Sequence, residues 1–152
     1  MGDYLYFGED GPTHSIPLPP SSCREVSLHR KPRVVIIEDE FLVAWNLQQL
    51  LHDRNFDFCE IASDADGAVN LAVRQEAELL LVDVNLGEGP DGVEAVRRIS
   101  EYQKVVAIFI TAYTDEGNLG RIRRSFPEAP VLSKPVSSEL LFLAIEKVCP
   151  HL

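Results

Sequence analysis

The chain has 152 residues, of which 45% are hydrophobic and 25% charged, a composition typical of one soluble globular domain. Its net charge of -10 argues against a general nucleic-acid binder, because neutralising phosphates requires clustered Lys and Arg side chains. No apolar run approaches the ~20 residues of a membrane-spanning helix, and the three cysteines show neither disulfide nor zinc-site spacing. We therefore expect a cytoplasmic protein without nucleic-acid or membrane partners.

Residues 1–31 differ in composition from the rest of the chain. Four prolines lie there among glycine, serine and charged residues, without helical or strand periodicity. We predict a flexible N-terminal extension over residues 1–31 and one folded domain over residues 32–152. The aromatic cluster Tyr4-Leu5-Tyr6-Phe7 either docks on this or another molecule or is only a patch on a disordered tail.

From Arg33 onward, short apolar runs alternate with helical patterns. Val34–Ile37 is a β-branched run that predicts a strand buried on both faces. The helix after it, ending near Asn55, is expected to bury a broad apolar face that includes Leu42, Trp45, Leu47, Leu50 and Leu51. A second strand is predicted over Phe56–Ala62, followed by a helix capped by Asp64.

The second half of the chain continues the alternation. Leu79–Val82 predicts a third strand, and a glycine-rich loop precedes a helix from Val93 to about Tyr102. A fourth strand over Val105–Ile110 is followed by a glycine-containing helix over Asp115–Ser125. Then come a short strand, Val131–Leu132, and a last helix from Ser137 that is expected to bury Leu140, Leu141, Leu143, Ile145 and Val148.

Five strands alternating with five helices predict an α/β fold, a doubly wound five-stranded parallel sheet. In such sheets the reactive site lies outside the carboxyl ends of the strands, near the point where strand order reverses. The residues at or just after four of these ends are all polar: Glu38, Asp39, Asp83, Thr111 and Lys134. Each alone is commonly a helix cap or a solvated side chain, but together they predict a site.

The acidic residues of this set point to a divalent cation. Two like charges about 4 Å apart repel by about 4 kcal/mol at an effective dielectric constant of 20, so Glu38, Asp39 and Asp83 need a counter-charge. Mg²⁺ suits a site of a few carboxylates, waters and a phosphate oxygen. Asp83 can then act as a nucleophile on phosphorus, while Lys134 and the Thr111 hydroxyl contact phosphoryl oxygens.

Four segments carry a family resemblance: Ile37-Glu38-Asp39-Glu40, Val82-Asp83-Val84-Asn85, Ile110-Thr111-Ala112 and Ser133-Lys134-Pro135. They resemble the signature segments of response-regulator receiver domains of the single-domain, CheY-like type, and the resemblance spans residues 33–150. The segment from Phe109 to Tyr113 is similar to stand-alone receivers of the alphaproteobacterial kind.

The resemblance implies a flavodoxin-like receiver fold and a role as a stand-alone response regulator in a two-component phosphorelay. A histidine kinase or a histidine phosphotransfer protein would phosphorylate Asp83. Mg²⁺ would be held by Glu38, Asp39, Asp83 and the backbone carbonyl of Asn85, while Lys134 and Thr111 would sense the phosphoryl group. We expect a phosphoacceptor that promotes its own phosphorylation and hydrolysis rather than an enzyme. Its signal would pass to an unknown protein partner, and a homodimer is one open arrangement.

The sequence departs from the family at two places. Val131 stands where receivers usually place an aromatic residue, so the usual coupling of that ring to the threonine is in doubt, and Tyr113 is a candidate substitute gate. Gly87 stands where a proline is common, in a loop that is one residue longer than usual. Val131 leaves open a pseudo-receiver, a protein-interaction module that is not phosphorylated, although the intact set of site residues argues against it.

Two enzyme-like or cofactor-binding alternatives fit less well. A phosphatase of the haloacid dehalogenase kind also uses an Asp after a strand, but it places a second acid two residues on, where this chain has Asn85. A flavin-binding protein of similar fold needs a phosphate cradle in its first loop, which is acidic here.

Overall fold

The computed structural model describes residues 4–5, 16–17, 30–112 and 116–150. In the folded part of this range, one parallel sheet consists of β3 (Val34–Ile37), β4 (Cys59–Ala62), β5 (Leu79–Val82), β6 (Val106–Thr111) and β7 (Val131–Ser133). The helices between and after them are α1 (Phe41–His52), α2 (Ala65–Gln75), α3 (Gly92–Ser100), α4 (Glu116–Ser125) and α5 (Ser138–Val148). The strand order β4-β3-β5-β6-β7 confirms the predicted doubly wound α/β fold.

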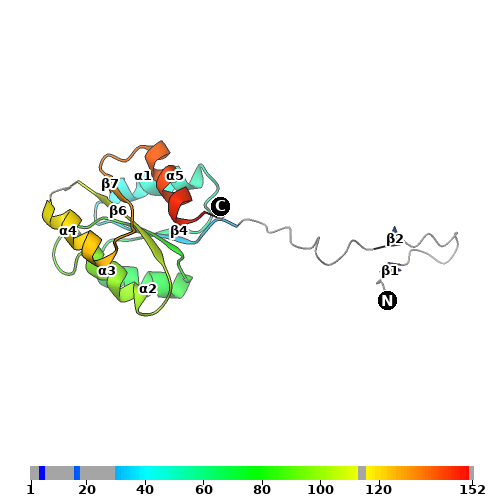
Figure 1. Ribbon diagram of the computed structural model, residues 1–152, viewed down its shortest axis with the longest axis horizontal. Coiled ribbons are helices and arrows are strands. Elements are labelled where there is room, and N and C mark those ends of the chain that lie inside the picture. The colour runs from blue at the N-terminus through cyan, green and yellow to red at the C-terminus, as the bar shows by residue number, and fades with distance from the viewer. Residues whose placement is uncertain (1–3, 6–15, 18–29, 113–115, 151–152) are drawn as a thin grey trace.

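The helices cover the sheet on both faces (Figure 1). Successive side chains of a strand point to opposite faces, so each strand contributes to two apolar cores. Val35, Val82 and Phe109 belong to the core on the side of α2 and α3, whereas Ile36 and Leu81 belong to the core on the side of α1 and α5. This double burial explains the runs of apolar residues without a polar side, which the sequence analysis interpreted as buried strands.

Some predicted details are wrong. β4 begins at Cys59 rather than at Phe56, whose buried ring instead contacts Phe142 of α5 with ring centroids 6.2 Å apart. Several leucines and an aromatic residue expected in the core are largely exposed on α1 and α5, namely Leu42, Trp45, Leu140 and Leu143. Each of these helices packs on a single sheet face, so only a narrow stripe of its apolar surface is covered.

Before Arg30, the N-terminal extension is described only at two short strands. β1 (Tyr4–Leu5) pairs antiparallel with β2 (Ile16–Pro17), which the sequence analysis did not predict. The rest of the predicted flexible extension, up to residue 29, lies outside the described residues, and its flexibility stays a prediction. Among the helices that the structure does describe, none has both the length and the apolar character that a membrane span requires.

The start of α3 lies in close contact with the end of β5. The N–H of Gly92 donates to the carbonyl oxygen of Val84 at 2.9 Å. A Cβ at Gly92 would lie 1.9 Å from the carbonyl oxygen of Asp83 and 2.6 Å from Cγ1 of Val82. Only glycine therefore allows α3 to begin where it does, and this contact sets the backbone around Asp83.

We predict that Gly92→Ala lowers the free energy of unfolding by about 3 kcal/mol, the upper part of the usual range for overpacking, because the backbone of β5 must move. Urea denaturation followed by circular dichroism measures this loss. Gly120→Ala is the matched control, since among the described residues its Cβ would meet only the Arg124 guanidinium, at 3.7 Å. There we expect a gain of about 0.5–1 kcal/mol from better helix propensity. Equal stability of the two variants would contradict the close contact.

Candidate functional site

The candidate site residues are held by backbone hydrogen bonds that continue the sheet beyond the strands. The N–H of Glu38 donates to Ala62 at 3.0 Å, and the N–H of Asp83 donates to Ile37 at 2.8 Å. The N–H of Lys134 donates to the carbonyl oxygen of Thr111 at 3.0 Å. These residues therefore lie at one edge of the sheet in fixed positions. The reversal of strand order falls between β3 and β5, and Glu38 and Asp83 directly follow these two strands.

The Lys134 ammonium lies between two carboxylates. Its Nζ is 2.7 Å from Oε2 of Glu38 and 2.8 Å from Oδ2 of Asp83. The other oxygen of each carboxylate accepts a backbone N–H: Glu40 donates to Oε1 of Glu38 at 3.2 Å, and Asn85 donates to Oδ1 of Asp83 at 3.2 Å. Both carboxylates are therefore oriented from two sides.

The two carboxylates are buried, which affects the pKa values of Glu38 and Lys134. Glu38 is 2% exposed and Asp83 is 7% exposed. Burial raises the pKa of Glu38, and repulsion by Asp83 adds to the rise, although the hydrogen bond from Lys134 opposes it. Burial alone would lower the pKa of Lys134, but its hydrogen bonds to Asp83 and Glu38 outweigh that effect, and the pKa is raised. Lys134 therefore stays cationic at neutral pH, where it is the partner of two acidic groups.

The carboxylates meet the geometric requirement of a metal site. One ligand oxygen from each of Glu38, Asp39 and Asp83 lies within 4.8 Å of the other two, and Asp39 is exposed to solvent. Buried, mutually repelling oxygen donors fit a hard divalent cation such as Mg²⁺, which favours carboxylates and keeps several waters. Asn85 reaches the same place through its backbone N–H. The part of its carbonyl oxygen in metal binding stays a prediction.

Thr111 is fully buried at the end of β6, directly beside Ser133 in the β6–β7 pair. Val131, which stands at the usual aromatic position, is half-buried, pairs with Phe109 and packs against the core of α2 and α3. The usual coupling between a mobile aromatic ring and Thr111 therefore cannot operate through this position. Tyr113, the candidate substitute gate, lies outside the described residues.

The loop after Asp83 explains the missing proline. Gly87 has a φ of 69°, which proline cannot adopt because its ring fixes φ near −65°. A Cβ at Gly87 would lie 3.3 Å from Oδ2 of Asp39, so this glycine also leaves room beside the acidic cluster. In the sequence alone, Gly87 stands out as a departure from the family, whereas Gly92 does not. The dipeptide Asp91-Gly92 at a helix start was the available signal, since Asp91 Oδ1 caps α3 by accepting the N–H of Glu94 at 3.0 Å.

Comparisons with known proteins agree with this geometry. The profile of the response regulator receiver domain matches residues 34–146. The chain is 32% identical over 93 residues to the phyllosphere-induced regulator PhyR of Methylorubrum extorquens, covering 60% of this chain and 35% of PhyR. It is 31% identical over 114 residues to the transcriptional regulatory protein PdtaR of Mycobacterium tuberculosis, covering 75% of this chain and 55% of PdtaR.

A solved structure shows the same fold. The signal receiver domain of a modulated diguanylate cyclase from Desulfovibrio desulfuricans G20 aligns with a TM-score of 0.69 at 32% identity, covering 76% of this chain and 90% of that domain. The two curated relatives are longer: the chain spans about a third of PhyR and about half of PdtaR. The likeness therefore concerns the receiver part of these regulators.

We predict that Mg²⁺ stabilises the protein through the acidic cluster. At ten times its dissociation constant, Mg²⁺ should raise the free energy of unfolding by about 1.4 kcal/mol. Without Mg²⁺, Asp83→Asn should unfold at a higher temperature than the unchanged protein, because one of three like charges is removed while Lys134 keeps its contact with Glu38. The same variant should respond more weakly to Mg²⁺. Differential scanning calorimetry with and without Mg²⁺ measures both effects.

Asp57→Asn is the control for this experiment, because Asp57 is exposed and precedes β4 at the other end of the sheet. It should retain the full response to Mg²⁺. An Asp83→Asn variant with the same response as Asp57→Asn would show that Mg²⁺ acts elsewhere.

Proposed function

The chain belongs to the response regulator receiver domain family, and from this premise we propose that it is a phosphorylation-controlled switch of a two-component pathway. In this proposal Asp83 accepts a phosphoryl group from a histidine kinase or a histidine phosphotransfer protein. The observation that carries the proposal is the Lys134 ammonium placed within 2.8 Å of carboxylate oxygens of Glu38 and Asp83. A phosphoryl group arriving at Asp83 would meet a cation that is already in position.

The proposed transfer needs three contributions from the chain. A carboxylate oxygen of Asp83 attacks phosphorus, the phosphorus–nitrogen bond of the donor breaks, and the imidazole keeps the electron pair. Lys134 faces the charge on the transferred group, and the Thr111 hydroxyl donates a hydrogen bond to a phosphoryl oxygen. Glu38, Asp39, Asp83 and the carbonyl oxygen of Asn85 would hold Mg²⁺, which supplies positive charge to the transferring phosphoryl group.

An exposed apolar surface beside the site suits a protein donor. Phe41, Leu42 and Trp45 of α1 are 68%, 69% and 49% exposed, and α1 starts three residues after Glu38. Leu42 also lines a groove of about 390 Å³ that reaches Lys134 and Val136. Large exposed apolar side chains next to a reactive group are typical of protein-binding surfaces. We therefore assign this face of α1 to the phosphohistidine donor.

The proposal includes two further parts. The protein acts as a phosphoacceptor that promotes its own phosphorylation and hydrolysis, rather than as an enzyme with a separate substrate, and it works in the cytoplasm. Phosphorylation adds negative charge and acceptor oxygens at the end of β5, which biases the surface that a downstream protein binds. The competing pseudo-receiver function is favoured by Val131, which is half-buried and packs against the core in the position of the usual aromatic ring.

The test is phosphorylation by acetyl phosphate followed by intact-protein mass spectrometry. The unchanged protein should gain the mass of one phosphoryl group only when Mg²⁺ is present, and Asp83→Asn should gain none. Asp57→Asn, at the far end of the sheet, should behave like the unchanged protein. Absence of the gain in all three proteins, with a phosphohistidine donor as well, would favour the pseudo-receiver.

The role of α1 has its own variant. Leu42→Ala should slow transfer from a phosphohistidine protein about fivefold to tenfold, the effect of losing a contact worth about 1 kcal/mol or slightly more, without changing transfer from acetyl phosphate. Val73→Ala, an exposed apolar residue of α2 on the opposite face, is the control and should change neither rate. Equal effects of Leu42→Ala on both donors would remove α1 from the docking surface.

A further inference from the structure

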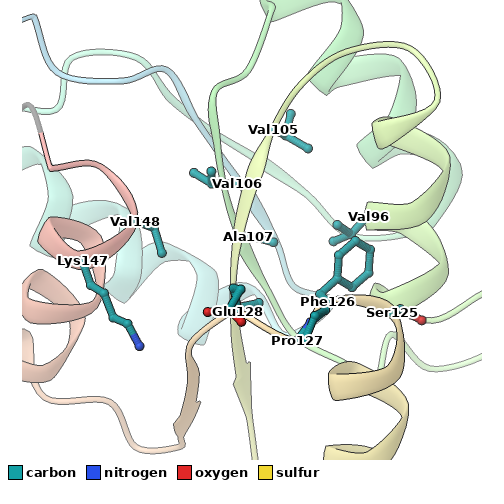
Figure 2. Close-up of a pocket in the computed structure, with 11 residues that line it drawn as sticks. Val96, Val105, Val106, Ala107, Ser125, Phe126, Pro127, Glu128, Lys147 and Val148 are labelled. Carbon is teal, nitrogen blue, oxygen red and sulfur yellow. The ribbon is translucent and has the colours of Figure 1, made fainter.

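An apolar cavity lies at the end of the sheet opposite to the candidate site. Its volume is about 460 Å³, within the range of about 300–1,000 Å³ that is usual for ligand pockets. Figure 2 shows Val96 and Phe126 on one side of β6 and Lys147 and Val148 of α5 on the other, with Val106 and Ala107 of β6 between them. The residues that bind Asp83 have no part in this cavity.

The cavity coincides with an open edge of the sheet. β6 runs from Val106 to Thr111, but β7 pairs only with its residues from Phe109 onward. The N–H of Phe109 donates toward β7, to the carbonyl oxygen of Pro130 at 2.9 Å. Ala107 lies two residues earlier, so its N–H and C=O point to the same side, where Pro130 has no N–H to offer. Within the described residues, no strand pairs with this part of the edge.

The N-terminal extension joins the folded domain at the same end of the sheet as this cavity. The Arg30 guanidinium donates to both carboxylate oxygens of Glu78, each at 2.8 Å. The carbonyl oxygen of Glu78 in turn accepts the N–H of Val106, which lines the cavity. Because β1 pairs with β2, only residues 18–29 separate the β1–β2 pair from Arg30, and twelve residues can span at most about 40 Å. The extension therefore begins at the same end of the sheet as the cavity and is long enough to reach it.

The extension and the cavity are also complementary in charge and apolar character. The cluster Tyr4-Leu5-Tyr6-Phe7 is flanked by acidic residues, Asp3, Glu9 and Asp10. The cavity is lined mainly by apolar side chains, with Lys147 at its margin and the basic last turn of α4 directly before Ser125. Glu128 also lines the cavity, and its negative charge opposes this attraction. Extended segments bind to open sheet edges through main-chain hydrogen bonds while alternate side chains fill pockets.

We propose that the cavity is the docking site for residues 4–7 of this same chain, which add to β6 beside Ala107 and place an aromatic ring in the cavity. Tethering supports such a contact, since a short linker gives an effective concentration in the millimolar range. The docked segment contacts Phe126, whose ring packs on Phe109 with centroids 5.7 Å apart, two residues before Thr111. The docking itself does not depend on phosphorylation of Asp83.

The test is amide hydrogen exchange of Ala107, measured by NMR on the full chain. In the unchanged protein this amide should exchange about tenfold more slowly than in the variant Tyr4→Ala/Tyr6→Ala/Phe7→Ala, which corresponds to about 90% docking. The methyl resonances of Val105 and Val148, which line the cavity, should shift in the same variant through loss of ring currents. The variant Thr13→Ala/His14→Ala/Ser15→Ala keeps the aromatic cluster and is the matched control, expected to match the unchanged protein.

Two results would overturn the proposal. Equal Ala107 exchange in the unchanged protein and in the aromatic variant would show that the cluster does not occupy the edge. Protection that rises with protein concentration would assign the edge to a second copy of the chain instead. Lys147 is exposed at the cavity margin, so Lys147→Glu should weaken the protection of the Ala107 amide. An unchanged exchange rate of this amide would show that attraction to Lys147 does not contribute to docking.

Discussion

Repulsion between carboxylates at one edge of the sheet is the constraint on which the site depends. Glu38 and Asp83 are buried side by side because β3 and β5 are neighbours at the reversal of strand order, and Asp39 adds a third acidic group. Lys134, which directly follows β7, balances only part of this charge. A site with unbalanced negative charge attracts a divalent cation, and cation and ammonium together attract a phosphoryl group. The proposed switch thus follows from the placement of charges by the fold.

The same placement demands close packing around β5. Asp83 is fixed on one side by its backbone bond to Ile37 and on the other by the start of α3, where only Gly92 fits. Thr111 and Lys134 are joined through the β6–β7 ladder. Phosphorylation at Asp83 would therefore act on a rigid strand end, and its effect would pass most easily to the neighbouring strand β6. That strand also lines the cavity at the opposite end of the sheet.

Much of this could be predicted from the sequence. A parallel strand buried on both faces is encoded by a run of apolar residues, which predicts the fold. Polar residues directly after such runs lie at one edge of the sheet, which predicts that Glu38, Asp39, Asp83 and Lys134 converge. The exposure of Leu42 and Leu140 could not be predicted, because helical periodicity does not show how much of a helix's apolar face the sheet covers. Gly92 and the open edge at Ala107 depend on distances between elements, which a linear pattern does not contain.

The most direct test of the account is to locate the modified residue. The protein would be phosphorylated with acetyl phosphate and Mg²⁺, reduced with borohydride, which converts an aspartyl phosphate to homoserine, and sequenced by tandem mass spectrometry. The account predicts homoserine at position 83 and nowhere else, dependent on Mg²⁺. Homoserine or its homologue at Asp39 or Glu38, or conversion that is independent of Mg²⁺, would contradict it.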